Sequence, residues 1–445
     1  MSWKVVLAIL TCNVVMMSSS YTMIIPFLPL YLANDLQADP DTVNIWTGAI
    51  FAVCFAVTAV MAPIWGKMSD SRGKKLMVMR SSSLIAVAYI LGGLVQTPLQ
   101  LFFVRILQGF AAGLWPASLS LMSAYVPKTK VGIAMGIMQS ANICGGIIGP
   151  LFGGVMAEAF GMRISFFIAG SALVLITLIT LFFIKEPPRQ QAEPGAVKAP
   201  TASYGSLLKS GTIRMLLLCT GLTNMVILLL QPIMTLYIGQ LRGTQENLLM
   251  VSGLVFSFSG IAGAIAAPIW GRQGQAHGFF KTEVISLFAA GVLICSQFIP
   301  STLIPFAILN FIVGLGFSGI FPSANSMIIV NTQTSERGTA FGLLFSAQQI
   351  GGTVGPLLGG VLATFIDYGY IFPIAGSVLV CLSLFLFFKA PAEMRRNPTA
   401  ASATVQKKRA NINKIKEQIV AELKAEAAAK QDSASAAASA GKEQH

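Results

Sequence analysis

The sequence predicts an all-α membrane protein in which twelve transmembrane helices form two pseudo-symmetric six-helix bundles. Three observations lead to this fold class: the composition, the spacing of long apolar segments and an internal repeat. Of the 445 residues, 54% are hydrophobic and 11% are charged, and the mean hydropathy is +0.72. Soluble globular proteins carry about 25% charged residues. Because so few charges cannot cover a water-facing surface, most of the chain is expected to lie in a membrane.

Twelve apolar segments are long enough to cross a bilayer, which takes about 20 mostly apolar residues in a helix. The first is too long for the core of a signal peptide and shows no convincing cleavage site, so it is expected to stay as a helix. The twelve segments lie near 4–33, 44–64, 76–96, 99–125, 131–157, 163–184, 212–239, 248–270, 281–299, 303–330, 337–364 and 368–389.

The basic residues predict how these helices are oriented. If the loops alternate between the two sides of the membrane, beginning inside, 17 Lys and Arg residues before residue 390 lie inside and only Arg163 and Arg242 lie outside. Cytoplasmic loops carry such an excess of basic residues, so both termini are expected in the cytoplasm. The net charge of +13 therefore reports orientation and does not indicate nucleic-acid binding. The outer loops instead carry acids, namely Asp35, Asp39, Asp41, Glu158, Glu246 and Asp367.

Two changes in composition divide the chain. Residues 185–211 are polar and rich in Pro, Ala and Ser, which predicts a cytoplasmic linker between an N-terminal bundle at 1–184 and a C-terminal bundle at 212–389. Residues 390–445 form a cytoplasmic tail rich in Ala, Lys and Glu. The tail is either a helix that lies on anionic lipid or a solvated, partly disordered segment. The helical alternative is suggested by the spacing of Ile412, Ile415, Ile419 and Leu423 beside basic residues.

The two halves of the chain repeat one another. Three motifs recur in the same order at an offset of 205 or 206 residues, which indicates that six helices were duplicated. Parallel repeats of this kind are typical of secondary transporters, whose binding site lies between the halves near the membrane midplane. The pairs are APIWG at 62–66 and 267–271, GLWPASLS at 113–120 with GIFPSANS at 319–326, and GPLFGGV at 149–155 with GPLLGGV at 355–361.

The loop between the second and third helices, GKMSDSRGKK from Gly66 to Lys75, carries a recognisable motif. It resembles the signature loop of the major facilitator superfamily, and the chain as a whole resembles that superfamily's twelve-helix drug:proton antiporters over about 1–390. The resemblance implies a loop that latches the two halves in the outward-facing state, with Asp70 accepting hydrogen bonds at a helix end; alternatively, the basic cluster only fixes the topology. The residues that match are Gly66, Asp70, Arg72, Gly73, Lys74 and Lys75.

The second half departs from this pattern at the same loop. Its copy, GRQGQAHG, runs from Gly271 to Gly278 and places Gln275 opposite Asp70. Because the acid is lost there, one latch is expected and not two.

Arg105 is the only charge well inside any expected span, within the sequence RILQGFAAG. A charge at that depth is a functional hypothesis by default. It resembles the superfamily's helix-4 arginine, which implies a part in proton coupling, here together with Asp35 at the outer end of the first helix. The alternative is a structural arginine bound to carbonyl or amide groups.

The fifth span contains GGIIGPLFGG, whose small residues allow close helix packing and whose proline permits a bend. It resembles a motif of the superfamily's exporters, although ordinary close packing explains it as well. The stretch MIIPFLPLYL in the first helix looks most like the MdtG-type multidrug resistance proteins. The exporter motif comprises Gly145, Gly149, Pro150, Gly153 and Gly154.

Many drug:proton antiporters hold a carboxylate inside the membrane, and none is evident here: Glu283 and Glu336 are expected near the cytoplasmic face. A cavity without an internal acid should favour neutral or anionic amphipathic substrates over dications. Polar residues on helices expected to line the cavity are the candidate contacts, or else they join helices to one another. They are Asn13, Tyr21, Asn142, Asn224, Gln231, Asn310 and Gln348.

Together these features predict a secondary-active exporter of amphipathic small molecules, driven by protons and working as a monomer in contact with membrane lipid of the bacterial inner membrane. The alternatives are a dedicated exporter of one metabolite, such as a sugar, siderophore or lipid precursor, and a transporter-like sensor. No enzyme activity, catalytic residue, cofactor, metal or nucleic acid is expected: the chain has two histidines, its six cysteines lack metal-like spacing, and the phosphate-binding motif GxxxxGK[ST] is missing.

Overall fold

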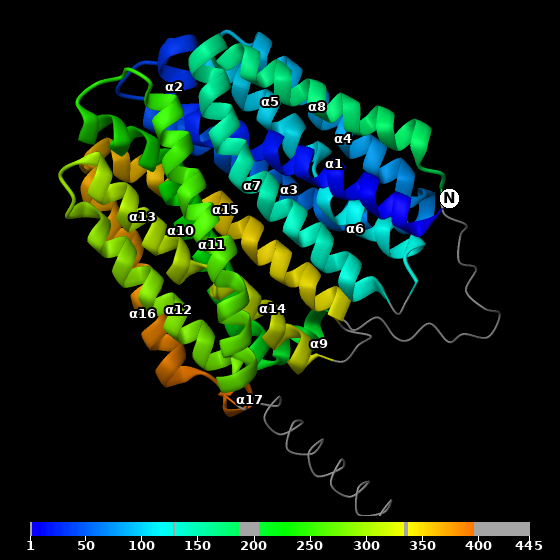
Figure 1. The fold of residues 1–445 in the computed structure, drawn as a ribbon. Helices are drawn as coiled ribbons and strands as arrows, with labels where there is room; N and C mark the ends of the chain where they lie inside the picture. The colour runs from blue at the N-terminus through cyan, green and yellow to red at the C-terminus, as the bar shows by residue number, and fades with distance from the viewer. Residues whose placement is uncertain (1, 128–129, 187–203, 333–336, 396–445) are drawn as a thin grey trace, which may run out of the picture.

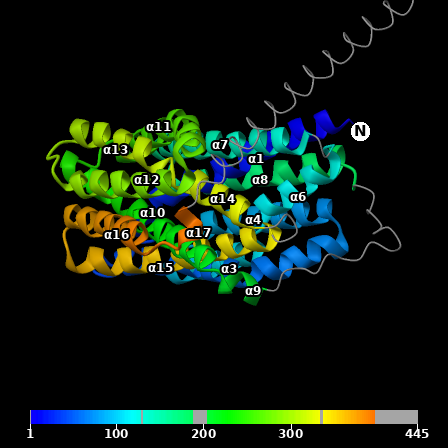
Figure 2. The same ribbon diagram turned by 90° about the horizontal axis from the view of Figure 1, so that it is seen from below.

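The computed structural model describes residues 2–127, 130–186, 204–332 and 337–395, and within these ranges the chain is helical with no strand. Figure 1 shows two groups of long helices, the first coloured blue to teal and the second green to orange. Buried apolar side chains form one cluster that lies almost entirely within residues 6–184 and another within residues 207–394. The second view shows that the long helices of both groups run in roughly the same direction (Figure 2).

The helices of the first group follow the expected spans closely. They are α1 (Trp3–Ile24), η1 (Ile25–Phe27), α2 (Leu28–Leu30), η2 (Tyr31–Asp35), α3 (Val43–Arg72), α4 (Lys74–Leu94), α5 (Pro98–Ala111), α6 (Leu114–Tyr125), α7 (Val131–Phe160) and α8 (Met162–Phe183).

A short helix, α9 (Tyr204–Lys209), precedes the second group. That group consists of α10 (Gly211–Arg242), α11 (Leu248–His277), α12 (Phe279–Cys295), η4 (Ser296–Phe298), α13 (Leu303–Phe317), α14 (Ile320–Asn331), α15 (Arg337–Phe365) and α16 (Tyr368–Lys389), followed by α17 (Ala392–Arg395).

Eleven helical segments of the described chain are long and apolar enough to cross a membrane. The remaining expected span, at 337–364, corresponds to α15, whose 29 residues are long enough but include many glycines together with Gln348 and Gln349. A helix that packs on other helices over much of its length needs less apolar surface than one that faces lipid. Large apolar side chains such as Phe182 and Phe365 are exposed.

The spans expected at 99–125 and 303–330 are not single helices. Each is broken near its middle, between α5 and α6 and again between α13 and α14. At the first break Gly113 has a φ of +112°, which glycine adopts without strain. Pro116 and Pro322 then lie in the first turn of the following helix, where a missing N–H costs little because the first amide groups have no helical partner.

The repeat in the sequence extends to individual contacts. The indole N–H of Trp65 donates a hydrogen bond of 2.8 Å to the carbonyl of Phe110, and that of Trp270 donates one of 2.7 Å to the carbonyl of Leu315. Both pairs span 45 residues. The two bundles therefore share a backbone framework in detail.

The bundles meet at one end of the molecule and separate toward the other. At the joined end, α7 packs on α11 and α15 packs on α3 across the boundary between them. Toward the opposite end the helices diverge, as Figure 1 shows below and to the right of the centre. At Gly136 on α7 and Gly342 on α15, no atom of the described residues lies within 4 Å of where a Cβ would stand.

Candidate functional site

The glycines of the exporter motif lie on two faces of α7. On one face, a methyl group at Gly145, Gly149 or Gly153 would collide with backbone carbonyl oxygens of α1 in the same bundle. On the other face, a methyl group at Gly154 would collide with the carbonyl of Leu249 on α11, across the boundary. These glycines therefore let α7 approach both α1 and the opposite bundle at backbone distance.

Pro150 takes part in the same crossing. Its carbonyl lies against Gly253 of α11, and one turn away the hydroxyl of Ser257 donates a hydrogen bond of 2.7 Å to the carbonyl of Ile147. Pro150 cannot donate a backbone hydrogen bond inside its helix, and this lets α7 bend at the crossing point.

The second half repeats this crossing on the other side of the molecule. Glycines of α15 pack on α10 within the bundle, while Gly360 meets the carbonyl of Asn44 on α3 and Gly48 meets the carbonyl of Pro356. The amide of Asn44 also donates a hydrogen bond of 3.1 Å to the carbonyl of Ala363. The joined end is thus held by two symmetry-related helix pairs.

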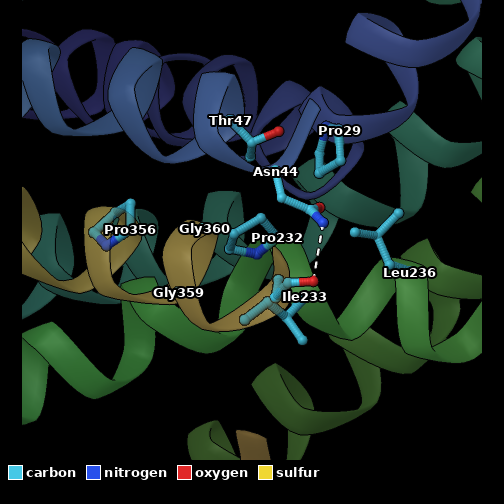
Figure 3. A pocket seen from close by; sticks show the side chains of 10 residues that line it. Pro29, Asn44, Thr47, Pro232, Ile233, Leu236, Pro356, Gly359 and Gly360 are labelled. Carbon is cyan, nitrogen blue, oxygen red and sulfur yellow. Dashed lines mark hydrogen bonds between the residues drawn. The ribbon is translucent and has the colours of Figure 1, made fainter. Parts of the chain in front are cut away.

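A small pocket lies between the bundles at this joined end, with room for roughly one water molecule. Figure 3 shows Pro29 and Asn44 of the first bundle facing Pro232 and Pro356 of the second, with the hydrogen bond from Asn44 drawn as a dashed line. Beside it, the hydroxyl of Thr235 donates a hydrogen bond of 2.7 Å to the carbonyl of Pro26. The two bundles are therefore held together at this end by backbone contacts and short polar side chains.

The signature loop holds a feature that the sequence did not predict. The carboxylate of Glu186 accepts hydrogen bonds from the backbone N–H groups of Lys74 and Lys75, at 2.7 and 3.0 Å, and so caps the first turn of α4. The turn before it is made by Gly73, which has a φ of +111°. The side chains of Asp70 and Arg72, and the surroundings of Gly66, lie outside the described part of the structure, so the latch stays a prediction.

Arg105 lies in α5 within a cluster of polar side chains, which we call the arginine cluster: Arg105, Gln108, Tyr21, Tyr89 and Cys54. The guanidinium donates a hydrogen bond of 2.8 Å to the side-chain oxygen of Gln108, and Gln108 is bonded in turn to Tyr89. Tyr21 and Cys54 are close enough to interact electrostatically with Arg105.

Two properties of the arginine cluster bear on its chemistry. Arg105 is only 4% exposed, and no carboxylate of the described residues pairs with it. Tyr21, in contrast, is 38% exposed. A buried cation that lacks an anionic partner is suited to bind an anion or to respond to a proton nearby.

Asp35 does not join Arg105. Its carboxylate forms an ion pair of 3.7 Å with Arg163, and the Arg163 guanidinium also donates a hydrogen bond of 3.2 Å to the carbonyl of Gly93. The structure therefore places the two residues expected to share proton coupling at separate sites.

The candidate cavity residues fall into two groups. Asn13 and Asn310 are each 2% exposed and bind within their own bundles: Asn13 donates to the hydroxyl of Thr180, and Asn310 donates to the carbonyl of Val255. These two act as interhelical links in this conformation. The side chains of the second group are exposed or half-buried: Tyr21, Asn142, Asn224, Gln231 and Gln348. Within this group, the side-chain amide of Asn224 donates a hydrogen bond to the backbone carbonyl of Gln348.

The hydrogen-bonded framework also identifies the counterpart of Arg105 in the second half. Helix α5 begins at Pro98 and α13 at Leu303, and the tryptophan bonds end at Phe110 and Leu315, an offset of 205 in each case. The residue that stands in place of Arg105 is therefore Asn310, and not Phe311 as an offset of 206 suggests.

Two further ionisable residues inside the bundles were not singled out from the sequence. Arg80 of α4 lies with its guanidinium carbon 3.7 Å from the centre of the Trp65 ring and donates a hydrogen bond of 3.0 Å to the carbonyl of Ala112. Glu283 of α12 is fully buried inside the C-terminal bundle. Its position beside the cytoplasmic end of an expected span made it look solvent-accessible in the sequence.

Comparison with known proteins agrees with this architecture. The family model described as Major Facilitator Superfamily matches residues 10–275 and 249–425. Multidrug resistance protein MdtG of Proteus mirabilis is 32% identical over 373 residues, which is 83% of this chain and 91% of the relative. The protein of the same name from Salmonella heidelberg is 29% identical over 382 residues, which is 85% of this chain and 94% of the relative.

Solved structures share the fold at low sequence identity. The crystal structure of the nucleoside transporter NupG superposes with a TM-score of 0.72 at 15% identity, covering 88% of this chain and all of that one. A bacterial homolog of the human lysosomal transporter Spinster, in an inward-facing and unoccupied conformation, superposes with a TM-score of 0.69 at 17% identity, covering 89% of this chain and 97% of that one. These likenesses establish the arrangement of the helices.

Proposed function

Because the chain belongs to the major facilitator superfamily, we propose that this multi-pass membrane transporter is a secondary-active exporter of neutral or anionic amphipathic small molecules. It resides in the bacterial inner membrane with both termini in the cytoplasm. Transport proceeds by rocking of the two bundles around a site between them, and protons moving inward drive it.

The observation that carries this proposal is the asymmetry between the two ends of the molecule. The end held by the α7–α11 and α15–α3 pairs is in contact, whereas the bundles diverge toward the opposite end, where α8 leads into residue 186 and Gly136 and Gly342 have open space beside them. The excess of basic residues places the open end in the cytoplasm. A substrate can therefore enter from the cytoplasm in this conformation and leave outward once the contacts reverse.

The substrate class follows from the charge inside the first bundle. Arg105 is buried, no carboxylate of the described residues pairs with it, and Tyr21 of the same cluster is partly exposed. Such a site attracts an anionic group and repels a cation, because nothing near it offsets a second positive charge. The relatives are named multidrug resistance proteins, which supports export of several amphipathic compounds.

The test is efflux from a pump-deficient bacterium that expresses this chain, measured with ethidium, a Hoechst dye, an anionic amphipathic dye and a dicationic dye. We expect efflux of the anionic dye, no efflux of the dication, and loss of efflux when an uncoupler is added. Arg105→Ala should lower the rate about tenfold or more, a change of about 1.4 kcal/mol. Arg105→Lys should retain only part of the wild-type efflux rate, since lysine cannot reproduce the guanidinium geometry.

Two controls separate the causes. Arg242→Ala removes a cation from an outer loop and should leave efflux unchanged, and Asp35→Asn tests whether the Arg163 pair takes part in coupling. No efflux of any dye from a well-expressed protein would favour a dedicated exporter of one metabolite. Efflux that resists the uncoupler would contradict proton coupling.

A further inference from the structure

Glu283 lies in the second turn of α12, and its side chain has no exposed surface. Neither carboxylate oxygen has a hydrogen-bond partner among the described residues. The hydroxyl of Ser286, one turn further along the same helix, is likewise buried without a partner. An acid with both oxygens unpaired in a protein interior is rare, because buried polar groups are almost always hydrogen-bonded.

No cation of the described residues pairs with Glu283. Helix α12 packs mainly on α11, α13, α14 and α16 and touches α17. The basic residues of these helices, and Lys281 of α12 itself, make no ion pair with Glu283 within the described chain; they are Arg272, His277, Lys389 and Arg395. The ionisable group that does interact with it is the thiol of Cys219, which is buried on α10 and carries no charge to compensate the carboxylate.

The packing of the fold does not require an acid at this position. Gly73 and Gly278 precede α4 and α12 and share a positive φ, of +111° and +103°, so Val78 in the first bundle is the counterpart of Glu283 in the second at an offset of 205. Val78 is also fully buried. An apolar side chain therefore suits this position. Burying a carboxyl group there costs free energy that its packing contacts alone do not offset.

We propose that Glu283 is a proton-binding site of the C-terminal bundle. An ionised carboxylate without partners is far costlier in this interior than the neutral acid, so the group carries a proton in the conformation open at the cytoplasmic end. When the rocking of the bundles loosens the packing around α12 and water reaches the carboxyl, it transfers its proton to water and becomes a carboxylate, with hydronium as the other product. Proton binding thus favours the conformation seen here, since a ligand shifts an equilibrium toward the state that binds it better.

This inference rests on the proposed function and deepens it, because it places a coupling proton in the second bundle in addition to any effect of Arg105. It differs from the expectation that the membrane interior lacks an acid. The protonation of Glu283 can be measured without any transport assay, so its test does not depend on which substrate is exported or which ion drives export.

The first experiment records the infrared C=O stretch of protonated carboxylic acids in the purified full-length protein in lipid at neutral pH. We expect a band in the wild type that Glu283→Gln removes and that Glu246→Gln, a change in an exposed outer loop, leaves in place. Glutamine has nearly the same shape as the protonated acid, so the variant should fold. Identical spectra for the wild type and Glu283→Gln would overturn the proposal.

The second experiment follows the distance between spin labels introduced with noncanonical amino acids at Gly136 and Gly271, two positions with open space around them. In the wild type this distance should shorten as the pH rises, because loss of the proton removes the bias toward the open state. Glu283→Gln should keep the long distance at every pH, whereas Glu246→Gln should follow the wild type. A Glu283→Gln protein with the wild-type pH dependence would show that Glu283 is no part of the switch. If the infrared band and the pH response depend on Glu283 but an uncoupler does not change efflux, then protons do not drive transport, and Glu283 is still a proton-binding site.

Discussion

Gly154 in the N-terminal half and Gly360 in the C-terminal half occupy the same place in their bundles, each pressed against a backbone carbonyl of the other bundle. The same agreement holds for Trp65 and Trp270, whose indole groups make matching hydrogen bonds. At the ionisable residues the agreement ends. The halves thus preserve the contacts that bring backbones together and differ in the charges placed between them.

The first bundle carries buried or half-buried cations where the second has neutral residues. Asn310 stands in place of Arg105, and Ile285 in place of Arg80. The tyrosines around Arg105 also lose their hydroxyls in the second half, where the matching residues are Ile227 and Ile294. The second bundle in turn carries Glu283 where the first has Val78. Since each half adopts the same framework without the other's charges, the framework does not require these charges.

Exchanging the residues at positions 78 and 283 should give the largest effect. Val78→Glu places a carboxyl group in a fully buried position shaped for an apolar side chain and should destabilise the protein by several kcal/mol, enough to abolish folding or nearly so. Glu283→Val should leave the melting temperature of the purified protein unchanged or raise it, because it removes an unpaired acid. Size-exclusion profiles and thermal melting check both. Equal tolerance of the two substitutions would mean that a buried carboxyl group costs little at this position in either half.

The crossing glycines should give a smaller effect of equal size in both halves. A methyl group in Gly154→Ala or Gly360→Ala meets a backbone carbonyl of the opposite bundle, which costs about 1–3 kcal/mol in the conformation joined at the outer end. Each variant should therefore increase the access of a membrane-impermeant reagent to the outer end of the pathway.

Gly136→Ala is the matched control for the glycine variants, since nothing lies within 4 Å of that position. It should not increase access at the outer end. If Gly154→Ala increases access at the outer end and Gly360→Ala does not, the two helix crossings contribute unequally to closing that end.

Much of this architecture could be predicted from the sequence because it depends on periodic apolar segments and on a repeat. The glycine motif at 145–154 indicated close packing, and the structure adds that Gly145 and Gly154 serve different partners, one in each bundle. The breaks at Gly113 and Ser318 were not predicted, since an apolar segment with two or three glycines is equally consistent with a continuous helix.

The candidate site was less predictable than the fold, because burial of a polar residue depends on which face of its helix is turned inward. Arg105 stood out as a lone charge in an apolar segment. Glu283 did not, since the apolar segment was taken to begin near residue 281 and an acid so close to its end usually reaches water. Asp35 and Arg105 were grouped by analogy with a family, whereas Arg163, an outer-loop residue by its position in the sequence, is the actual partner of Asp35.

The tryptophan pair offers the finest comparison of the two halves. Trp65→Phe and Trp270→Phe each remove one hydrogen bond to a carbonyl, and each should cost about 1 kcal/mol of unfolding free energy. Trp65 also covers the guanidinium of Arg80, whose Nε and Nη1 atoms have no hydrogen-bond partner among the described residues. A phenyl ring is a poorer face for a cation than indole, so Trp65→Phe should cost a further ~0.5–1 kcal/mol.

A double-mutant cycle assigns this difference to its cause. Arg80→Ile installs the residue that the second half has at position 285, so no cation remains over the ring. In that background Trp65→Phe and Trp270→Phe should destabilise the protein equally, as measured by denaturant unfolding in detergent micelles. If Trp65→Phe still costs more after Arg80→Ile, the excess comes from packing, and the two halves differ in their framework as well as in their charges. Equal costs would place the whole difference between these sites in one cation, consistent with a duplicated scaffold on which each half acquired its own ionisable groups.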